Sequence, residues 1–330
     1  MNRRPRALLG ALLAAAMLAA ACGGDDEEAG DGAVDEGGGD EELTPITVGI
    51  LPLSGLAPLW YGIEQGYFED EGLEVSTEIG EGGAALTPAV LEGDYQFAIG
   101  EYVSLMQARE SDVGIQVVSN LTNGADEADQ GINALLTAPG SGIEGVEDLA
   151  GRTVAVNGLG GVDDVTIKAI LDDNGIDPSS VEFTEVPFPD MNAAVEAGQV
   201  DVASQPEPFV TLGEQAGLAN LLDPYYEAVP SMPLGMVFGS EEWLAENPDL
   251  AEAFTRALDR SIEASSDEEA MKEVIVANTD IDAELVDEIA LDRWDAEINR
   301  EGLEELADLS VRYGVLEEQP DLNALVWQPE

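Results

Sequence analysis

From residue 46 onward, short runs rich in β-branched residues alternate with longer stretches in which apolar residues recur at helical spacing. Residues 46–51 predict a strand, for example, and residues 58–69 predict a helix. This alternation is typical of βαβ units, in which crossover helices join parallel strands. The sequence therefore predicts an α/β fold with mainly parallel sheets flanked by helices.

The alternation falls into two sets, and helices follow them. The first set also predicts strands at 73–78, 96–99 and 115–120 and helices at 84–91 and 101–109. The second predicts extended segments at 133–137, 153–157, 181–186 and 200–203 and helices at 145–150, 162–174, 192–197 and 208–217. Beyond Gly239 the pattern is nearly all helical, most clearly at 243–247, 250–265, 268–278 and 301–313. We therefore expect two lobes, with lobe 1 at residues 44–136, lobe 2 at 137–230, and a return to lobe 1 with C-terminal helices at 231–330.

A weak internal repeat connects the two sets. Residues 84–98 and 193–203 each contain an apolar helix, a glycine and a short strand. Glycine suits the left-handed backbone that commonly ends a helix. Glu101 follows the strand of one set and Glu207 follows that of the other. Open α/β sheets bind ligands at the carboxyl edge of their strands, so two such edges facing each other predict a cleft.

The N-terminal 43 residues differ in composition from the rest of the chain. Three arginines precede an apolar run at residues 7–21, which predicts a secretory signal peptide and is short for a membrane span. The run ends at Cys22 in a segment that resembles a bacterial lipobox, although Ala19 stands where a larger aliphatic residue is usual. The resemblance implies acylation of Cys22, as by palmitate, and a lipoprotein on the outer face of the cell membrane. Ordinary signal cleavage after Ala21 is the alternative. Residues 22–43, acidic and rich in glycine, predict a disordered tether.

Composition excludes several classes of function. A formal net charge of −57 argues against nucleic acid and anionic lipid as partners, because both need Lys and Arg to displace counterions. The chain has no histidine and one cysteine, which excludes Ser-His-Asp and Cys-His catalysis, imidazole metal ligands, zinc clusters and disulfides. Catalysis by carboxylates alone stays open. We expect a protein that is not an enzyme and that uses no metal or cofactor.

Several motifs occur together along the folded part of the chain. They are ITVGILPLSGLAPLWYGIEQGYFEDEGLEV from Ile46, Gly82-Gly83, FAIGEYVSL, GVEDLAGRTVAVNGLGG, VPFPDM and QPEPF. In combination they resemble the solute-binding proteins of the nitrate, sulfonate and taurine uptake family, which includes thiamine-pyrimidine binders. The resemblance implies a two-lobed, type II periplasmic-binding-protein-like receptor, a monomer held to the membrane only by its anchor. Such a receptor closes on a small-molecule ligand and delivers it to an ABC permease driven by a cytoplasmic ATPase.

The candidate ligand-binding residues lie where the two expected sheet edges meet. The aromatic residues among them can stack on a planar ligand or belong to the core, and the glycines either admit a close ligand or form turns. The two glutamates either contact the ligand or cap helices. The candidates are Ser54, Gly55, Trp60, Tyr61, Gly82, Gly83, Glu101, Tyr102, Asn157, Gly160, Gly161 and Glu207. Asp163 and Asp164 are interpreted instead as first-turn helix residues favoured by the macrodipole.

The class of ligand follows from the scarcity of basic residues. Between Thr44 and Thr255 only Arg109, Arg152 and Lys168 are basic, and each falls on a helix or a surface-like turn. Carboxylates and aromatic residues favour a neutral or cationic planar heterocycle, such as a pyrimidine, over an alkanesulfonate or nitrate. Two alternatives remain: a ligand sensor or docking protein of the same fold, and a carboxylate-based extracellular hydrolase.

Overall fold

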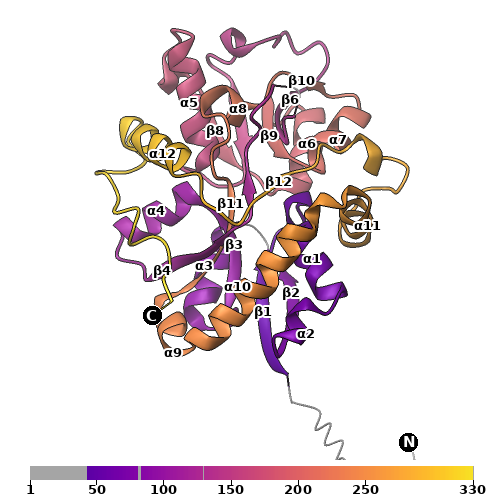
Figure 1. Cartoon of the computed structure of the whole chain (residues 1–330). Helices are drawn as coiled ribbons and strands as arrows, with labels where there is room; N and C mark the ends of the chain where they lie inside the picture. Colours follow the sequence, from indigo (N-terminus) through magenta and orange to yellow (C-terminus); the bar gives the residue numbers. More distant parts are fainter. Residues whose placement is uncertain (1–42, 81–82, 129, 330) are drawn as a thin grey trace, which may run out of the picture. The chain divides into compact units, whose positions relative to one another are not determined.

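The computed structural model of the chain describes residues 43–80, 83–128 and 130–329 (Figure 1). The predicted signal peptide, Cys22, nearly all of the predicted tether and Gly82 lie outside these residues. The described residues belong to one compact unit, which is built on two five-stranded sheets. None of the helices in the described part combines the length and the apolar composition that a bilayer crossing requires.

The first sheet contains β1 (Thr44–Ile50), β2 (Leu73–Ile79), β3 (Phe97–Glu101), β4 (Ile115–Asn120) and β11 (Gly235–Ser240). β1 pairs in parallel with β2 on one side and with β3 on the other. β11 comes from much later in the chain and pairs antiparallel with both β3 and β4. The strand order is therefore β2-β1-β3-β11-β4. We refer to this sheet and the helices packed on it as lobe 1.

The second sheet contains β6 (Asn133–Thr137), β7 (Thr153–Val156), β8 (Glu182–Glu185), β9 (Val202–Pro206) and β10 (Ala219–Asn220). β7 pairs in parallel with β8 and β9, whereas β6 pairs antiparallel with β9 and β10. Read from β8, the order β8-β7-β9-β6-β10 repeats the plan of the first sheet. The short repeat in the sequence thus belongs to equivalent elements of the two sheets. We refer to the second sheet and its helices as lobe 2.

In each sheet the antiparallel strand is the one that the chain enters directly from the other lobe. The chain leaves lobe 1 after β5 (Thr122–Asn123) and enters lobe 2 at β6. All five residues of β6 pair with β9, so the expected lobe boundary after residue 136 falls inside this strand. The first crossing therefore lies earlier, between Asn123 and Asn133. The second crossing lies between Ala228 and Gly235 and contains the other expected boundary.

Helices follow the strands in both lobes and continue beyond the second crossing. Those before β6 are α1 (Ala57–Glu64), α2 (Tyr67–Asp70), α3 (Gly83–Glu92) and α4 (Tyr102–Glu110). Those between β6 and β11 are α5 (Val162–Asp173), α6 (Phe188–Glu196), α7 (Phe209–Gln215) and α8 (Pro224–Ala228). The C-terminal helices are α9 (Glu241–Glu246), α10 (Pro248–Glu263), α11 (Glu268–Asn278) and α12 (Arg300–Arg312).

Some predicted elements differ from the observed ones for local reasons. The helix expected at 58–69 is divided because Gly66, at φ 72°, ends α1 before α2 begins. α6 begins four residues earlier than expected, since proline is well tolerated in the first helical turn. The segment at 145–150 forms only a 3₁₀ turn, Val146–Asp148. The C-terminal part also contains a two-residue strand, β12 (Arg293–Trp294), which pairs with β5 and is too short to show periodicity.

The central strands of the sheets are buried on both faces, whereas the edge strands β2, β8 and β10 are partly exposed. In β6, Ala134 and Leu136 belong to one apolar cluster of lobe 2 and Leu135 belongs to another, as the period of two in a strand requires. In lobe 1 the core extends from the sheet to the C-terminal helices. α10 buries residues three and four apart, such as Phe254 and Leu258, and packs on α1.

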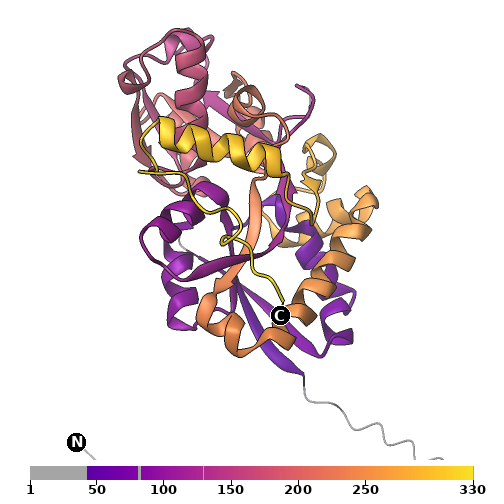
Figure 2. The same cartoon turned by 60° about the vertical axis from the view of Figure 1, so that its left-hand side comes forward.

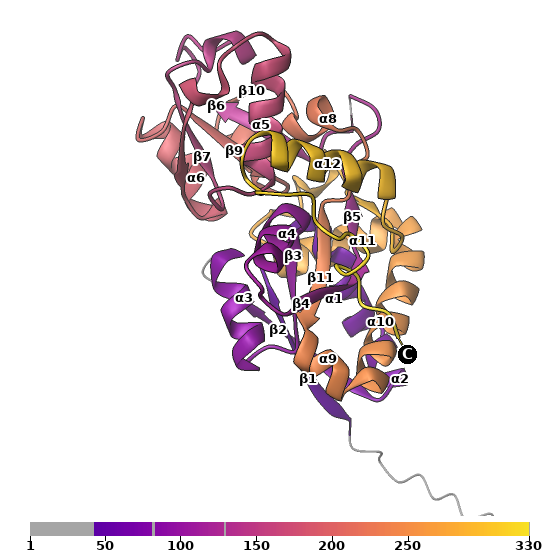
Figure 3. The same cartoon turned by 90° about the vertical axis from the view of Figure 1, so that its left-hand side faces the viewer.

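The last helix contacts both lobes. α12 lies against α4 of lobe 1 and α5 of lobe 2, as the two turned views show (Figure 2, Figure 3). Arg312, at its end, forms an ion pair with Asp172 of α5. After the helix, the carbonyl of Val315 accepts a hydrogen bond from Gln107 of α4 at 3.3 Å. The C-terminal segment therefore links the lobes instead of returning to lobe 1 alone.

The contact between α1 and α10 depends on a glycine. A Cβ at Gly62 would lie 2.1 Å from Ser261 Oγ and 2.9 Å from the Phe68 ring. Gly→Ala in a helix normally stabilises by up to about 1 kcal/mol, but overpacking costs about 1–3 kcal/mol. We expect Gly62→Ala to lower the free energy of unfolding by about 1–2 kcal/mol, measured by urea denaturation. Adding Ser261→Ala should recover part of this loss, and a Gly62→Ala protein as stable as wild type would contradict the packing.

Candidate functional site

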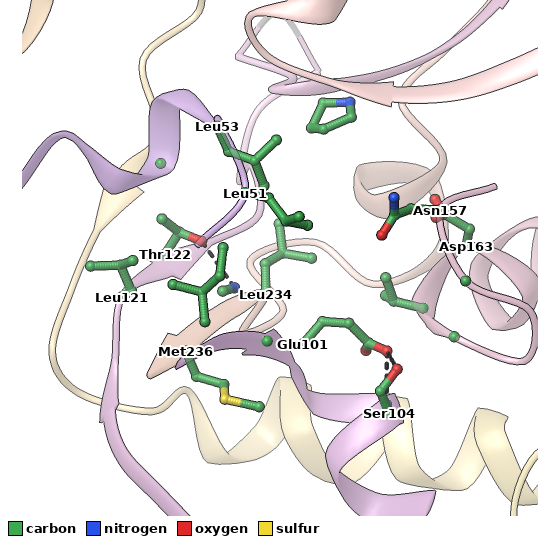
Figure 4. Close-up of a pocket in the computed structure, with 18 of the residues that line it drawn as sticks. Leu51, Leu53, Glu101, Ser104, Leu121, Thr122, Asn157, Asp163, Leu234 and Met236 are labelled. Atoms are coloured by element: carbon green, nitrogen blue, oxygen red, sulfur yellow. Dashed lines mark hydrogen bonds between the residues drawn. The ribbon is translucent and has the colours of Figure 1, made fainter. Parts of the chain in front are cut away.

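A cavity of about 340 Å³ lies at the carboxyl edges of the parallel strands of both lobes. Its size falls within the range of small-molecule sites, and most of the side chains that line it are apolar. Lobe 1 contributes the segments that follow β1, β3 and β4, and lobe 2 contributes those that follow β7 and β9. In Figure 4, Asn157 and Asp163 lie across the cavity from Leu51, Leu53 and Leu234.

The loop after β1 is held in place by distant parts of the chain. Ser54 Oγ donates a hydrogen bond to Asp292 Oδ2 at 2.8 Å, and the backbone N–H of Ser54 donates to the carbonyl of Glu207 at 3.2 Å. The indole N–H of Trp294 donates to the carbonyl of Gly55 at 2.9 Å. This edge of the cavity therefore joins lobe 1, lobe 2 and the C-terminal segment.

Glu101 ends β3 and caps α4. Its carboxylate accepts hydrogen bonds from the backbone N–H groups of Val103 and Ser104, each at 2.7 Å. It also accepts one from the backbone of Val162, at the start of α5 in the other lobe. A Cβ at Gly161 would lie 3.1 Å from Glu101 Oε1, so glycine permits this close approach. Burial raises the pKa of Glu101, although these hydrogen bonds act in the opposite direction.

Glu207 occupies the equivalent position in lobe 2. Its carboxylate accepts hydrogen bonds from Thr211 Oγ1 at 2.9 Å, from the Thr211 backbone at 3.1 Å and from the backbone N–H of Ala290 at 3.3 Å. The side chain is buried, and burial raises its pKa to about 7. Asp292 lies close enough to raise the pKa of Glu207 further by repulsion, and burial also raises the pKa of Asp292 itself, to about 6. Two carboxylates therefore share this end of the cavity.

Asp163 and Asp164 lie in the first turn of α5, as the sequence predicts, but they have different surroundings. Asp164 forms an ion pair with Lys168 at 3.6 Å. Asp163 lines the cavity and accepts hydrogen bonds from Ser204 Oγ at 2.6 Å and Tyr225 Oη at 2.9 Å. Burial raises the pKa of Asp163 to about 7. The sequence signal that could have identified Asp163 was its position just after the glycines that follow a strand.

The structure brings half of the sequence candidates to the cavity wall. These are Ser54, Gly55, Glu101, Asn157, Gly161 and Glu207. Their contact with a ligand stays a prediction. Asp163 and Asp292 also line the cavity, although the sequence did not make them candidates. Asp292 was missed because it lies far along the chain from the other cavity residues and belongs to none of the motifs.

Of the other candidates that the structure describes, Trp60, Tyr61, Tyr102 and Gly160 are not part of the cavity wall. Trp60 is 3% exposed and belongs to the core, because it lies on the face of α1 that packs inward. Tyr61 packs edge-on against Tyr67, with ring centroids 6.0 Å apart. Tyr102 is fully buried and donates its hydroxyl to Asn120 Oδ1 at 2.9 Å. Gly160, at φ 74°, forms a turn beside Gln107, and Gly83 begins α3. Of these aromatic residues, none reaches the ligand space.

The cavity is acidic. Glu101, Asp163, Glu185, Glu207 and Asp292 line it, and no Lys or Arg is among the described residues of its wall. The basic side chains are engaged elsewhere, as in the ion pair of Arg109 with Glu241. Within the described ranges, no group of three or more His, Cys, Asp or Glu side chains is arranged to hold a metal ion. The buried carboxylates are stabilised by hydroxyls and helix N-termini, and no cation pairs with them in the cavity wall.

Tyr102 allows the core and the cavity to be distinguished by experiment. Tyr102→Phe removes the hydrogen bond to Asn120 and leaves that buried oxygen without its donor, at a cost of about 1–2 kcal/mol. We expect urea denaturation to show this loss. Affinity for any ligand of the cavity should stay within about twofold, since the ring does not line it. A large loss of ligand affinity in Tyr102→Phe, with unchanged stability, would instead show that Tyr102 belongs to the binding site.

Comparison with known proteins adds information at the family level. The model of the NMT1/THI5-like family matches residues 54–270, which include the whole second sheet and every strand of the first sheet except β1. The Bacillus subtilis (strain 168) protein YtlA, which carries the name of a binding protein, is 22% identical over 230 residues. That alignment covers 66% of this chain and 65% of the length of YtlA.

Solved structures share the fold at low sequence identity. The ligand-binding component of an ABC-type import system from Staphylococcus aureus, with zinc bound, has a TM-score of 0.76 at 16% identity and covers 86% of this chain and 97% of its own. The nitrate-binding protein NrtA from Synechocystis PCC 6803 gives 0.71 at 15% identity, with 86% and 84% covered. The aliphatic sulphonate-binding protein SsuA from Escherichia coli gives 0.66 at 15% identity, with 87% and 92% covered. The expected two-lobed periplasmic-binding-protein fold is thereby confirmed.

Proposed function

This chain belongs to the NMT1/THI5-like family, and we propose that it is the solute-capturing component of an ABC importer. Its neighbours in structure include import components and periplasmic binding proteins. The cavity between the carboxyl edges of two equivalent sheets supports this role, because closure of such lobes encloses a small molecule. The permease that receives the solute is the proposed partner.

The proposal for the kind of solute rests on the acidity of the cavity wall. An anion placed there would face carboxylates in a desolvated space, where like charges repel strongly. A neutral or cationic ligand avoids this repulsion and can donate hydrogen bonds to the carboxylates. Phe188 and Phe238 line the same cavity and offer faces for a planar ring. We therefore favour a planar heterocycle, such as a pyrimidine, over an alkanesulfonate or nitrate.

Contacts across the cavity suggest how the lobes hold a solute. Ser54 of lobe 1 bonds to Glu207 of lobe 2, and Glu101 of lobe 1 bonds to the start of α5 in lobe 2. These contacts close two sides of the space. Their separation would open the cavity for entry and release.

Calorimetry tests the class of solute. We expect 4-aminopyrimidine to bind the purified protein, with serine at position 22 to prevent acylation, at least about tenfold more tightly than ethanesulfonate or nitrate, a difference of about 1.4 kcal/mol. The reason is that no Lys or Arg is among the described residues of the cavity wall. Tight ethanesulfonate binding without binding of the heterocycle would overturn the preference and leave the importer role intact.

We also propose that acylated Cys22 anchors the protein to the outer face of the cell membrane. We expect wild-type protein to incorporate labelled palmitate and to sediment with membranes. Cys22→Ser should carry no label and remain in the soluble fraction, because each buried CH₂ of an acyl chain contributes about 0.8 kcal/mol to membrane binding. Ala29→Ser, in the predicted tether, is the matched control and should behave as wild type. Label on Cys22→Ser would contradict the anchor.

A further inference from the structure

Asp163 differs from Glu101 and Glu207 in how it is hydrogen-bonded. Both of its hydroxyl donors, Ser204 and Tyr225, reach the same oxygen, Oδ1. The other oxygen, Oδ2, receives no hydrogen bond from the described residues. By contrast, Glu101 and Glu207 accept hydrogen bonds on both carboxylate oxygens. Asp163 is therefore a carboxylate of the cavity wall with an acceptor left over, whereas Asp164, which also has an unpartnered oxygen, does not line the cavity.

Asn133 adds a second, independent observation. It is 3% exposed, lines the same cavity and has an amide nitrogen, Nδ2, without a hydrogen-bond partner among the described residues. A buried amide group without a partner costs about 1–3 kcal/mol. None of the described residues therefore supplies the hydrogen-bond partner that this amide group needs.

The geometry around Ser204 decides which atom of Asn133 is left over. Ser204 Oγ lies 2.6 Å from Asp163 Oδ1 and 3.2 Å from Asn133 Oδ1, but a hydroxyl has only one proton. The shorter contact, to a carboxylate, takes that proton. Because the two ends of an amide have the same shape, Asn133 satisfies Ser204 by turning its NH₂ toward Oγ. Its carbonyl oxygen then takes the unpartnered position, on a side chain that shares with Asp163 the contact to Ser204 Oγ.

The start of α5 cannot serve here as an anion site. A helix N-terminus normally attracts anions, but Asp163 already places a negative charge in this first turn. Glu101 faces Asp163 from lobe 1 and adds repulsion. On the side of α8, the neighbours of Asp163 are Tyr225 and Asp223, which carry no positive charge. The nearby Lys168 is paired with Asp164. No cation among the described residues faces Asp163.

We propose that Asp163, with Asn133 beside it, forms the subsite for a protonated N–H group of the solute, such as an amidinium or an ammonium. This inference rests on the proposed solute-binding function and names the group that the cavity recognises. A cation with two N–H groups would donate one to Asp163 Oδ2 and one to the amide oxygen of Asn133. Asp163 is then the residue that sets specificity for charge.

The ligand-free protein should show the cost of this unpaired carboxylate as a pH dependence. Burial raises the pKa of Asp163 to about 7, well above its ordinary value, so the folded state holds a proton that the unfolded state has lost. This contribution to stability is present at pH 5 and is lost as the pH rises through about 7. Asp163→Asn keeps the shape and both hydroxyl contacts but cannot titrate.

The first measurement is thermal unfolding at pH 5 and pH 8 in 1 M NaCl, which screens surface charge. We expect the fall in Tm between these pH values to be several degrees smaller in Asp163→Asn than in wild type. Asp164→Asn is the matched control from the same helical turn and should retain most of the wild-type fall. An equal fall in wild type and Asp163→Asn would overturn the inference.

The second measurement is calorimetry with three probes that share one ring: benzamidinium, benzamide and benzenesulfonate. We expect benzamidinium to bind wild type most tightly and to lose about tenfold or more in affinity in Asp163→Asn, as removal of a charge-assisted hydrogen bond predicts. Benzamide should change little in that variant. Asp164→Asn should bind all three probes as wild type does.

The outcomes separate this inference from the function on which it rests. If benzenesulfonate binds most tightly, or if Asp163→Asn retains wild-type affinity for benzamidinium, the cation subsite is wrong. The same holds if benzamide binds and benzamidinium binds no better, although the protein then remains a solute receptor. If no probe and no heterocycle binds at all, both the subsite and the proposed function fail.

Discussion

Two antiparallel strands, β6 and β11, determine the arrangement on which the rest of the protein depends. β11 completes the sheet of lobe 1 from a distant stretch of the chain, so lobe 1 is discontinuous, whereas β6 begins the continuous segment that forms the sheet of lobe 2. Both strands begin at the edge where the parallel strands of their sheet end, and Asn133 and Gly235 therefore line the cavity. The crossings thus hold two carboxyl edges around one space. α12, which packs on α4 and α5, adds a third connection between the lobes.

The chemistry of that space is unusual for a strongly buried set of acids. Buried carboxylates are normally paired with cations or given enough hydrogen bonds to offset desolvation. Here helix N-termini and hydroxyls supply the hydrogen bonds for Glu101, Glu207 and Asp163, while the nearby Lys168 pairs with Asp164 outside the cavity wall. The raised pKa values of Asp163, Glu207 and Asp292 follow mainly from burial, since no described cation lines the cavity. These features support the proposed preference for N–H donors over anions.

The candidate site could be predicted from sequence where a local pattern existed. The repeat of helix, glycine and strand correctly placed Glu101 and Glu207 at equivalent strand ends, and both line the cavity. Trp60 and Tyr102 failed to reach it because the helical phase that turns a side chain inward is set by packing, which a single sequence does not show. Asp292 was missed because the contact with Ser54 spans 238 residues.

By itself, the sequence determined the alternation of strands and helices, the two-lobed α/β class and the absence of histidine chemistry, because periodicity and composition act locally along the chain. It also predicts an acylated anchor at Cys22, which lies outside the described residues. Only the tertiary structure decided that β6 belongs wholly to lobe 2 and that the C-terminal segment spans both lobes. The tertiary structure likewise turned Asp163 toward the cavity and Asp164 toward Lys168. Neighbours in sequence acquired opposite roles because burial and charge pairing depend on what the fold brings beside each side chain.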